Sequence, residues 1–190
     1  RRGVLLIFDE IPSAMGRTGK MFVCEHFDVV PDMLVIGKGL GGGIFPMAAL
    51  IAKEELDVVR DRALGHYTHE KSSVGCAAAL ATIDCLYEDG LIANANKLGA
   101  YALERLADMK ARLPLIHDVR GLGLFFGIEL RRDGTPASEE ADRVLYHSLS
   151  QGLSYKVGGS CVLTLCPPMT INANELDHAL DIIEDGIASV

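Results

Sequence analysis

Three short apolar runs in the first part of the chain constrain its fold most strongly. Continuous apolar runs of this length, separated by longer connections, are typical of parallel strands that are covered on both faces. The pattern predicts an α/β fold, in which residues at the carboxyl ends of neighbouring strands line a crevice. The runs are Val4–Phe8, followed by Asp9; Met33–Ile36, followed by Gly37-Lys38-Gly39; and Met47–Ala52.

The rest of the chain mixes helical periodicity with short strands and lacks the alternation of strand and helix found in parallel sheets. Such a mixture is typical of a small α+β domain. We place the boundary near residue 92, so that residues 1–91 belong to one domain and residues 92–190 to the second. We expect helices at Val74–Tyr87, Leu91–Leu113, Ser138–Gln151 (capped by Ser138) and Asn174–Ser189 (capped by Asn174), and strands at Leu122–Leu130 and Val162–Leu165.

Composition excludes some classes of partner. The chain has 190 residues, 49% of them hydrophobic, which suffices for one whole domain and part of another. A net charge of −8 opposes binding to nucleic acid or to an anionic membrane surface. The longest apolar stretches are too short to span a bilayer. The five cysteines form no CxxC pair, which indicates free thiols and a cytoplasmic protein.

Lys38 is the residue with the clearest chemical potential. It lies between glycines directly after an apolar run, in Gly37-Lys38-Gly39-Leu40-Gly41-Gly42-Gly43. A lysine beside apolar surface loses hydration, which favours the free amine that attacks a carbonyl. The glycines would let a planar group approach the backbone. The alternative interpretation is a surface lysine in a glycine-rich loop.

Asp9 ends the preceding apolar run, where a carboxylate can point into the crevice above a sheet. Paired with a pyridinium nitrogen, such a carboxylate keeps the nitrogen protonated and lets the ring draw electrons from a substrate. The alternative interpretation is that Asp9 caps a turn.

Two other kinds of site fit the sequence poorly. Gly39–Gly43 does not match GxGxxG and no acidic residue follows at the required distance, so a dinucleotide site is not predicted. His66-Tyr67-Thr68-His69-Glu70 contains metal-ligand residue types without an HExxH or CxxC partner. We therefore predict no metal site.

Several motifs in one order resemble the class III, or omega, aminotransferases, over nearly the whole chain. The resemblance implies a pyridoxal 5′-phosphate (PLP) enzyme. Residues 1–91 would be the C-terminal part of a PLP fold-type I large domain, and residues 92–190 the small α+β domain that follows it. The motifs are Phe8-Asp9-Glu10-Ile11, Gly16-Arg17-Thr18-Gly19, Pro31-Asp32, Gly37–Gly43, Tyr67-Thr68-His69, Val119–Leu124 and Pro167-Pro168.

The resemblance assigns roles to four of these residues. It implies that Lys38 forms the Schiff base and moves the proton at the substrate carbon. Asp9 would pair with the pyridine nitrogen, and Ile11 would pack against the ring. Thr68 would reach across a homodimer interface to the phosphate of the partner subunit's PLP. The active sites would therefore be shared between two subunits.

The sequence departs from the family at two positions. Pro12 stands where a glutamine usually bonds the PLP phenolic oxygen. Thr164 stands three residues before Pro167-Pro168, where many members have an arginine that holds the substrate carboxylate. An arginine–carboxylate contact is strong and specific. Its loss argues against a common α-amino acid bound in the usual way.

Other cations are available for an anionic substrate group. Lys156 precedes a pair of glycines in an expected loop, and His66 and Lys71 flank Thr68. Together with Thr164 these residues form our candidate substrate site. Clustered cations and free backbone N–H groups suit a phosphate or phosphonate better than a planar carboxylate. The alternative is that an arginine outside this chain replaces the missing one.

The resemblance makes amino transfer between an amine or amino acid and a keto acid the expected reaction of the full-length protein. One alternative is an ammonia- or phospho-lyase that acts on a phosphonate or phosphorylated amine. The other is a truncated, non-catalytic remnant. The first half of the family's large domain, which supplies the loop around the PLP phosphate, has no counterpart in this sequence. We therefore expect this chain alone to bind PLP poorly and to be inactive.

Overall fold

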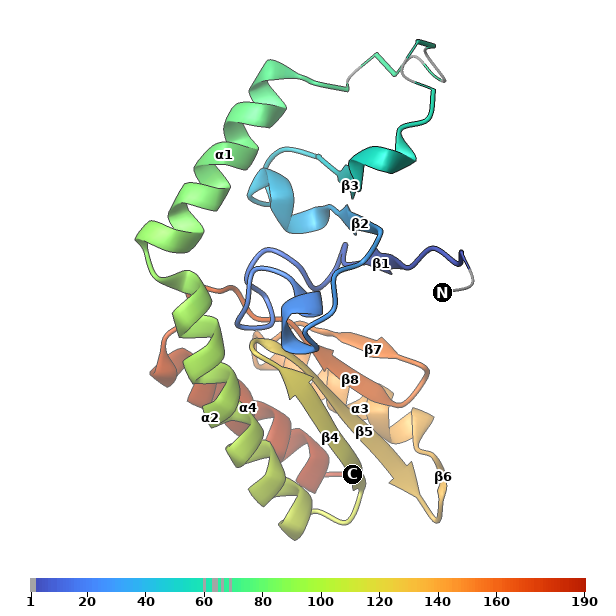
Figure 1. The fold of residues 1–190 in the computed structure, drawn as a ribbon. Helices are drawn as coiled ribbons and strands as arrows, with labels where there is room; N and C mark the ends of the chain where they lie inside the picture. Colours follow the sequence, from blue (N-terminus) through green and yellow to red (C-terminus); the bar gives the residue numbers. More distant parts are fainter. Residues whose placement is uncertain (1–2, 60, 63–64, 66, 69) are drawn as a thin grey trace. The chain divides into compact units, whose positions relative to one another are not determined.

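The computed structural model describes residues 3–59, 61–62, 65, 67–68 and 70–190. The chain divides into two compact units. The first unit comprises Arg1–Gly16 and Lys20–Leu91, and the second comprises Arg17–Gly19 and Ile92–Val190. Figure 1 shows the elements of both, coloured along the chain. The short stretch Arg17–Gly19 therefore packs with the second unit although its neighbours in sequence belong to the first.

The first unit is built on a sheet with the order β1-β2-β3. β1 and β2 are parallel, with Ile7 opposite Met33 and Asp9 opposite Val35. The fold is α/β, as predicted, since the chain combines helices with a sheet whose first two strands are parallel. The elements are β1 (Ile7–Asp9), β2 (Met33–Ile36), β3 (Ala49–Ala52), the 3-10 helices Val23–His26, Lys38–Gly41 and Glu54–Leu56, and α1 (Ser73–Glu88).

The third apolar run differs from its prediction, because β3 is antiparallel to β2. The connection between these two strands contains only the 3-10 helix Lys38–Gly41. Without a crossover helix, the chain returns beside β2 in the opposite direction. The expected cover on both faces is also absent within the described residues, since Ile7, Leu50 and Ile51 are 54%, 59% and 48% exposed.

The second unit is α+β, with an antiparallel sheet in the order β4-β5-β8-β7. A short strand, β6, pairs with the end of β5. α2 and α4 lie side by side (Figure 1), and Arg105 on α2 binds two aspartates of α4, Asp177 at 2.7 Å and Asp181 at 2.8 Å. The elements are α2 (Leu91–Arg112), β4 (Ile116–Leu122), β5 (Phe125–Arg132), β6 (Thr135–Pro136), α3 (Ser138–Ser150), β7 (Lys156–Gly158), β8 (Val162–Leu165) and α4 (Ala173–Ala188).

Three predictions for this unit were wrong in detail. The expected strand Leu122–Leu130 spans a turn and parts of two strands, because Gly123 has a φ of +53° and reverses the chain. α3 is not capped by Ser138, which is its first residue and follows the N-cap Ala137. α4 is capped by Asn172, whose side chain accepts from the Glu175 N–H at 3.0 Å. The Glu175 carboxylate bonds back to the Asn172 N–H, which completes a capping box.

The core of the second unit lies between the helices and one face of the sheet. Alternate residues of β5 are buried, namely Phe126, Ile128 and Leu130, as a strand with one covered face requires. Leu106 on α2 and Leu180 on α4 are buried against them. Burial of one such side chain contributes about 1.5–3 kcal/mol, so these contacts dominate the stability of the unit.

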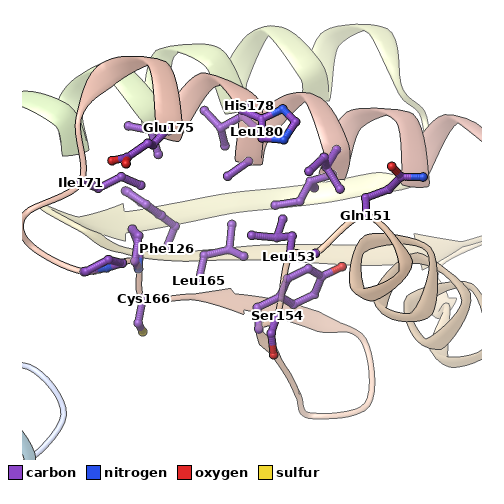
Figure 2. A pocket seen from close by; sticks show the side chains of 18 residues that line it. Phe126, Gln151, Leu153, Ser154, Leu165, Cys166, Ile171, Glu175, His178 and Leu180 are labelled. Carbon is purple, nitrogen blue, oxygen red and sulfur yellow. The ribbon is translucent and has the colours of Figure 1, made fainter. Parts of the chain in front are cut away.

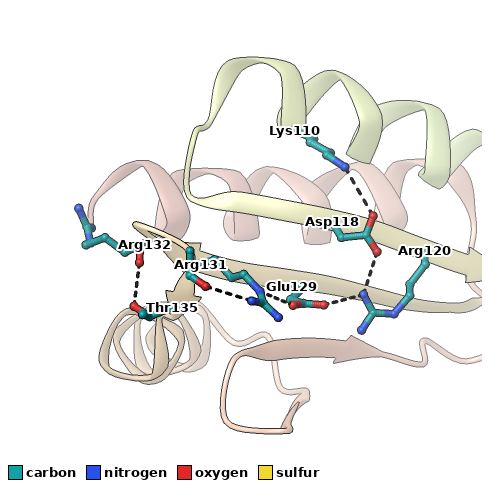
Figure 3. A network of polar contacts seen from close by, with 8 residues as sticks. Lys110, Asp118, Arg120, Glu129, Arg131, Arg132 and Thr135 are labelled. Carbon is teal, nitrogen blue, oxygen red and sulfur yellow. Dashed lines mark hydrogen bonds and ion pairs between the residues drawn. The ribbon is translucent and has the colours of Figure 1, made fainter.

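The other face of the β4–β5 hairpin carries a chain of charges, shown in Figure 3. Arg120 on β4 binds Asp118 at 2.9 Å and Glu129 at 3.0 Å, and Glu129 also binds Arg131 at 2.7 Å. Lys110 on α2 reaches Asp118 at 3.5 Å. The neighbouring arginines hold the pKa values of Asp118 and Glu129 below their usual range. Surface ion pairs individually contribute little to the free energy of unfolding. These pairs therefore determine which face of the hairpin is turned to solvent more than they stabilise it.

Three backbone segments meet at the β4–β5 turn without room for a side chain. A Cβ added at Gly123 would lie 2.6 Å from Gly19 N and 2.7 Å from Arg17 O. A Cβ added at Gly99 on α2 would lie 2.5 Å from the Cα of Gly123. The turn is therefore held between α2 and the Arg17–Gly19 stretch by glycine alone. We call this contact the glycine junction.

We predict that Gly123→Ala destabilises the full-length protein more than Gly134→Ala does. Both glycines have positive φ, +53° and +78°, so both alanines carry the same kind of backbone strain. Only position 123 also forces a collision with neighbouring backbone, which adds about 1–3 kcal/mol of overpacking. Thermal or urea unfolding measures the difference. Equal losses at the two positions would contradict a tight junction.

Candidate functional site

A pocket of 410 Å³ in the second unit is a poor candidate for the catalytic centre. Its walls are mostly apolar and include Phe126 and Leu165 from the sheet and Leu180 from α4. Figure 2 shows its polar side chains, Gln151 and Glu175 among them, spread around the lining rather than directed to one point. The Glu175 carboxylate already serves the capping box of α4. The pocket therefore lacks the convergent polar groups of a reaction centre.

The candidate site lies at the carboxyl ends of β1 and β2. Asp9 is the last residue of β1 and pairs in register with Val35. Lys38 follows the end of β2 by two residues and begins a 3-10 helix. Because the two strands are parallel, both functional groups leave the sheet at the same edge, which is where open α/β sheets bind their ligands.

Ile11 lies beside the backbone that carries Lys38. Two of its side-chain carbons, Cγ1 and Cγ2, lie 3.6 Å from the position that a Cβ of Gly37 would take. The Cβ of Ala48 lies 3.4 Å from the same position. Ala48 also lines an open pocket of 450 Å³ together with Lys38, Pro46 and Met47. The structure therefore brings Asp9, Ile11 and Lys38 to one edge of the sheet.

The Asp9 carboxylate is exposed and points back to its own loop. Its Oδ1 accepts the N–H of Ile11 at 3.1 Å. This bond is the turn-capping role that the sequence also allowed for Asp9. A carboxylate held this way keeps a defined orientation at the strand end.

Lys38 is exposed in the described structure. The apolar surroundings that we expected to take water from its amine are not provided by the described residues. Its φ is +43°, a left-handed value that costs a residue with a side chain about 1–2 kcal/mol. Backbone strain of this kind is often found at functional positions, although Lys71 shows it too.

Glu10, between Asp9 and Ile11, is a residue whose role sequence reasoning missed. Its side chain is 2% exposed. The carboxylate accepts the N–H groups of Val23 at 2.6 Å and Cys24 at 2.9 Å. Its own N–H donates to Val35 O at 2.9 Å. Glu10 therefore ties the segment with Asp9 and Ile11 to β2 and to the 3-10 helix Val23–His26. The two donors follow Glu10 by 13 and 14 residues, so no local sequence pattern indicates these bonds.

Thr68 and Lys71 lie in the segment that precedes α1, and both are exposed. Lys71 Nζ lies 3.8 Å from Glu70. No described hydrogen bond or ion pair joins either residue to Asp9 or Lys38. His66, the third candidate in this segment, lies outside the described residues.

Thr164 and Lys156 lie directly opposite each other on β8 and β7 in the second unit. Lys156 is therefore the first residue of a strand rather than part of a loop, which corrects our expectation. Thr164 Oγ1 lies 3.3 Å from the position that a Cβ of Gly158 would take. Directly opposed residues of an antiparallel pair project from the same face, so the structure places Thr164 and Lys156 on one face of the sheet.

Arg17 lies in the loop of the glycine junction and is half-buried. Its Nη1 donates to the carbonyl of Pro167 and, at 3.4 Å, to that of Leu124. The Leu124 N–H donates to Arg17 O at 2.9 Å. Burial lowers the pKa of Arg17, and the nearby Cys166 opposes that shift. The Arg17–Gly19 stretch thus closes one end of the sheet in the second unit.

Comparison with known proteins assigns this arrangement to a family. The pattern that defines the aminotransferases of class III matches residues 1–187. The chain belongs to the class III aminotransferase family. Class III aminotransferases are PLP-dependent enzymes whose substrates are small amines and keto acids.

Relatives in the class III family carry out more than one reaction. The (R)-1-hydroxy-2-aminoethylphosphonate ammonia-lyase of Vibrio splendidus (strain 12B01) is 46% identical over 100% of this chain and 40% of its own length. The ornithine aminotransferase of Brevibacillus brevis is 38% identical over 95% of this chain and 43% of its own length. A solved structure of a phospholyase from Arthrobacter in complex with phosphoethanolamine is 32% identical, with a TM-score of 0.91 over 98% of this chain and 46% of that one.

The chain thus spans less than half the length of the class III relatives that it matches. Its own residues nevertheless suit the cofactor of the family. An exposed carboxylate fits a pyridine nitrogen, an aliphatic side chain fits the face of a ring, and an exposed amine fits an aldehyde. In the part of the chain that the structure describes, no helix is long and apolar enough to cross a membrane.

We predict that Glu10→Gln lowers the free energy of unfolding of the full-length protein by about 1–3 kcal/mol, because a neutral amide binds the N–H groups of Val23 and Cys24 less strongly. Glu25→Gln is the matched control. Glu25 also accepts a backbone N–H, that of Phe22 at 2.7 Å, but at an exposed position. Urea unfolding should show a small change for the control. An equal change in both variants would contradict the anchoring role of Glu10.

Proposed function

We propose that the full-length protein is a PLP-dependent enzyme that forms a Schiff base at Lys38 and acts on small amines. Transfer of the amino group to a keto acid is the reaction for which its family is named. One observation carries the proposal. A carboxylate, an aliphatic side chain and a lysine amine leave two parallel strands at the same edge of the sheet.

Each residue would have a separate task. Bound PLP supplies an electron sink for a substrate carbon. Asp9 would hold the proton on the pyridine nitrogen, and Ile11 would pack against one face of the ring. Lys38 would hold the cofactor through its amine and would then accept and return the proton at the amine-bearing carbon of the substrate. Pro12 cannot supply the side-chain bond to the phenolic oxygen that the usual glutamine provides.

The groups that would bind the PLP phosphate come from outside the 190 residues of this chain. The phosphate-binding loop belongs to the first half of the large domain, and Thr68 completes it from the partner subunit of a homodimer. The exposed position of Thr68 in this chain supports that role, because an intersubunit contact needs an accessible side chain. The lack of a disulfide among the five cysteines, all of which the structure describes, supports a protein of the reducing cytoplasm.

A specific observation favours a second candidate reaction, elimination of ammonia from an amino phosphonate. Thr164 stands where many family members have their carboxylate-binding arginine, and Lys156 is its partner on the neighbouring strand. The turn after Lys156 reverses at Gly159, with a φ of +53°, and Ser160, with a φ of +65°. A lysine ammonium together with turn N–H groups suits a tetrahedral phosphonate better than a planar carboxylate.

The relatives support the same substrate class. Both the 46% identical lyase and the phospholyase structure are named for substrates that carry phosphorus. For a 1-hydroxy-2-aminoethylphosphonate, proton removal by Lys38 at the amine-bearing carbon would expel the hydroxyl of the next carbon. Hydrolysis would then release ammonia and leave an aldehyde. We propose this elimination as the second candidate reaction of the full-length protein, at the site that would carry out amino transfer.

We predict that borohydride reduction of the PLP-loaded, full-length protein marks Lys38. Reduction fixes the cofactor to the lysine that carries the imine, and peptide mapping by mass spectrometry locates it. Lys20, Lys53 and Lys71 are internal controls in the same unit. A mark on any of these in place of Lys38 would refute the assignment, and no mark at all would favour a non-catalytic remnant.

We predict that the full-length enzyme has a higher kcat/KM for 2-aminoethylphosphonate and its 1-hydroxy analogue than for alanine, glutamate or 4-aminobutyrate. Ammonia release from the hydroxy analogue and amino transfer to pyruvate or 2-oxoglutarate are measured in parallel. Thr164→Arg should move the preference toward glutamate by roughly tenfold or more, because a charge-assisted hydrogen bond contributes about 1.5–3 kcal/mol. A clear preference of the unaltered enzyme for the carboxylates would restore an ordinary aminotransferase.

A further inference from the structure

Arg17 occupies the end of the sheet at which β5 begins and β8 ends. The last register pair between these strands is Phe126 with Leu165. Just beyond it, the guanidinium of Arg17 donates from one nitrogen to the carbonyls of Leu124 and Pro167. The Arg17 carbonyl accepts the N–H of Leu124 at 2.9 Å. A single residue thus continues the hydrogen bonding between two strands after their own ladder has stopped.

The chain needs such a residue at this corner. Pro167 and Pro168 have no backbone N–H, so β8 cannot extend its ladder through them. The half-buried Pro167 carbonyl would otherwise lose a partner, which is costly away from water. Arginine suits the place because one planar group presents several donors in fixed directions. The Arg17 side chain, from a distant part of the sequence, therefore fixes the position of the backbone at Cys166 and Pro167, where the chain leaves β8. We call this place the Pro167 corner.

The backbone around Arg17 cannot shift easily. Its loop and the Gly123 turn touch through backbone atoms alone in the glycine junction. A Cβ added at Gly19 would lie 3.0 Å from Asn96 on α2, so the far side of the loop is also tightly packed. If the guanidinium is replaced, the loop therefore cannot move to compensate, and the backbone at the Pro167 corner shifts instead.

We propose that Arg17 is a positioning residue for substrate binding: it fixes the Pro167 corner and, through it, the Thr164 end of β8. Thr164 is three residues before Pro167 and faces Lys156 across the ladder. This inference rests on the proposed function, because it takes the Thr164–Lys156 pair to hold the anionic group of the substrate. Arg17 itself touches backbone and not the reacting atoms.

The experiment compares Arg17→Gln and Arg17→Lys with Arg143→Gln in the full-length, PLP-loaded enzyme. Arg143 is the control because it is also on the second unit, is 60% exposed and meets Glu140 only at 3.9 Å. We expect Arg17→Gln to raise KM for the amino phosphonate roughly tenfold while kcat and borohydride labelling of Lys38 stay unchanged, since only substrate binding is affected. Arg17→Lys should restore part of the KM, and Arg143→Gln should match the wild type.

A double-mutant cycle with Thr164→Val separates positioning from general destabilisation. If Arg17 acts through the Thr164 end of β8, the double variant should raise KM by less than the product of the two single effects. Multiplicative effects would overturn the proposal, as would a lowered melting temperature with unchanged KM. Failure of both Arg17 variants to fold would show a purely structural role. An unaltered enzyme without labelling at Lys38 would instead overturn the proposed function.

Discussion

The second unit depends on a contact between backbones, the glycine junction. Hydrophobic burial between the helices and the sheet is large but tolerant, since side chains of similar volume exchange at small cost. A contact between two backbone segments does not tolerate substitution, because any added carbon atom must displace the backbone itself. Gly99, Gly123 and the Thr18–Gly19 peptide therefore fix α2, the β4–β5 turn and the Arg17–Gly19 stretch in one arrangement. The position of Arg17, and through it the end of β8, follows from that arrangement.

The candidate site depends on a different constraint, the parallel pairing of β1 and β2. Parallel pairing brings Asp9 and Lys38 to one edge although 28 residues separate them in sequence. Glu10 then holds the segment after β1 in place through buried charge-assisted bonds. Asp9 and Lys38 are exposed, whereas Glu10, which follows Asp9 in the sequence, is buried. The chemistry is thus carried by residues that contribute little to stability, on a support that contributes much.

Sequence patterns predicted the elements whose cause is local. α1, α2 and β8 were found within about two residues of their expected ends, because their periodicity or apolar run is continuous. The direction of β3 was wrong, since an apolar run carries no sign of direction. The β4–β5 turn was missed because Leu122–Leu130 reads as one apolar stretch until the positive φ of Gly123 is known. Lys156 was placed in a loop because β7 has only three residues.

The features of the candidate site also divide into those that the sequence predicts and those that it does not. The pairing of Asp9 with Lys38 was visible from strand ends, and the roles of Ile11 and Thr68 came only from the family resemblance. The anchoring bonds of Glu10 and Arg17 join residues up to 150 positions apart, and no pattern in the sequence records them. Such contacts are a property of the folded chain.

The exposed sheet of the first unit has a consequence for handling the protein. The segment leading into β1 and the strand itself present Val4, Leu5, Leu6 and Ile7, which are 83%, 48%, 42% and 54% exposed. β1 is also the edge of its sheet, so its outer backbone groups are open to another strand. An apolar edge of this kind is a template for intermolecular strand pairing and aggregation. Expressed by itself, this span would therefore be prone to insolubility, whereas a longer chain that covers the edge would protect it.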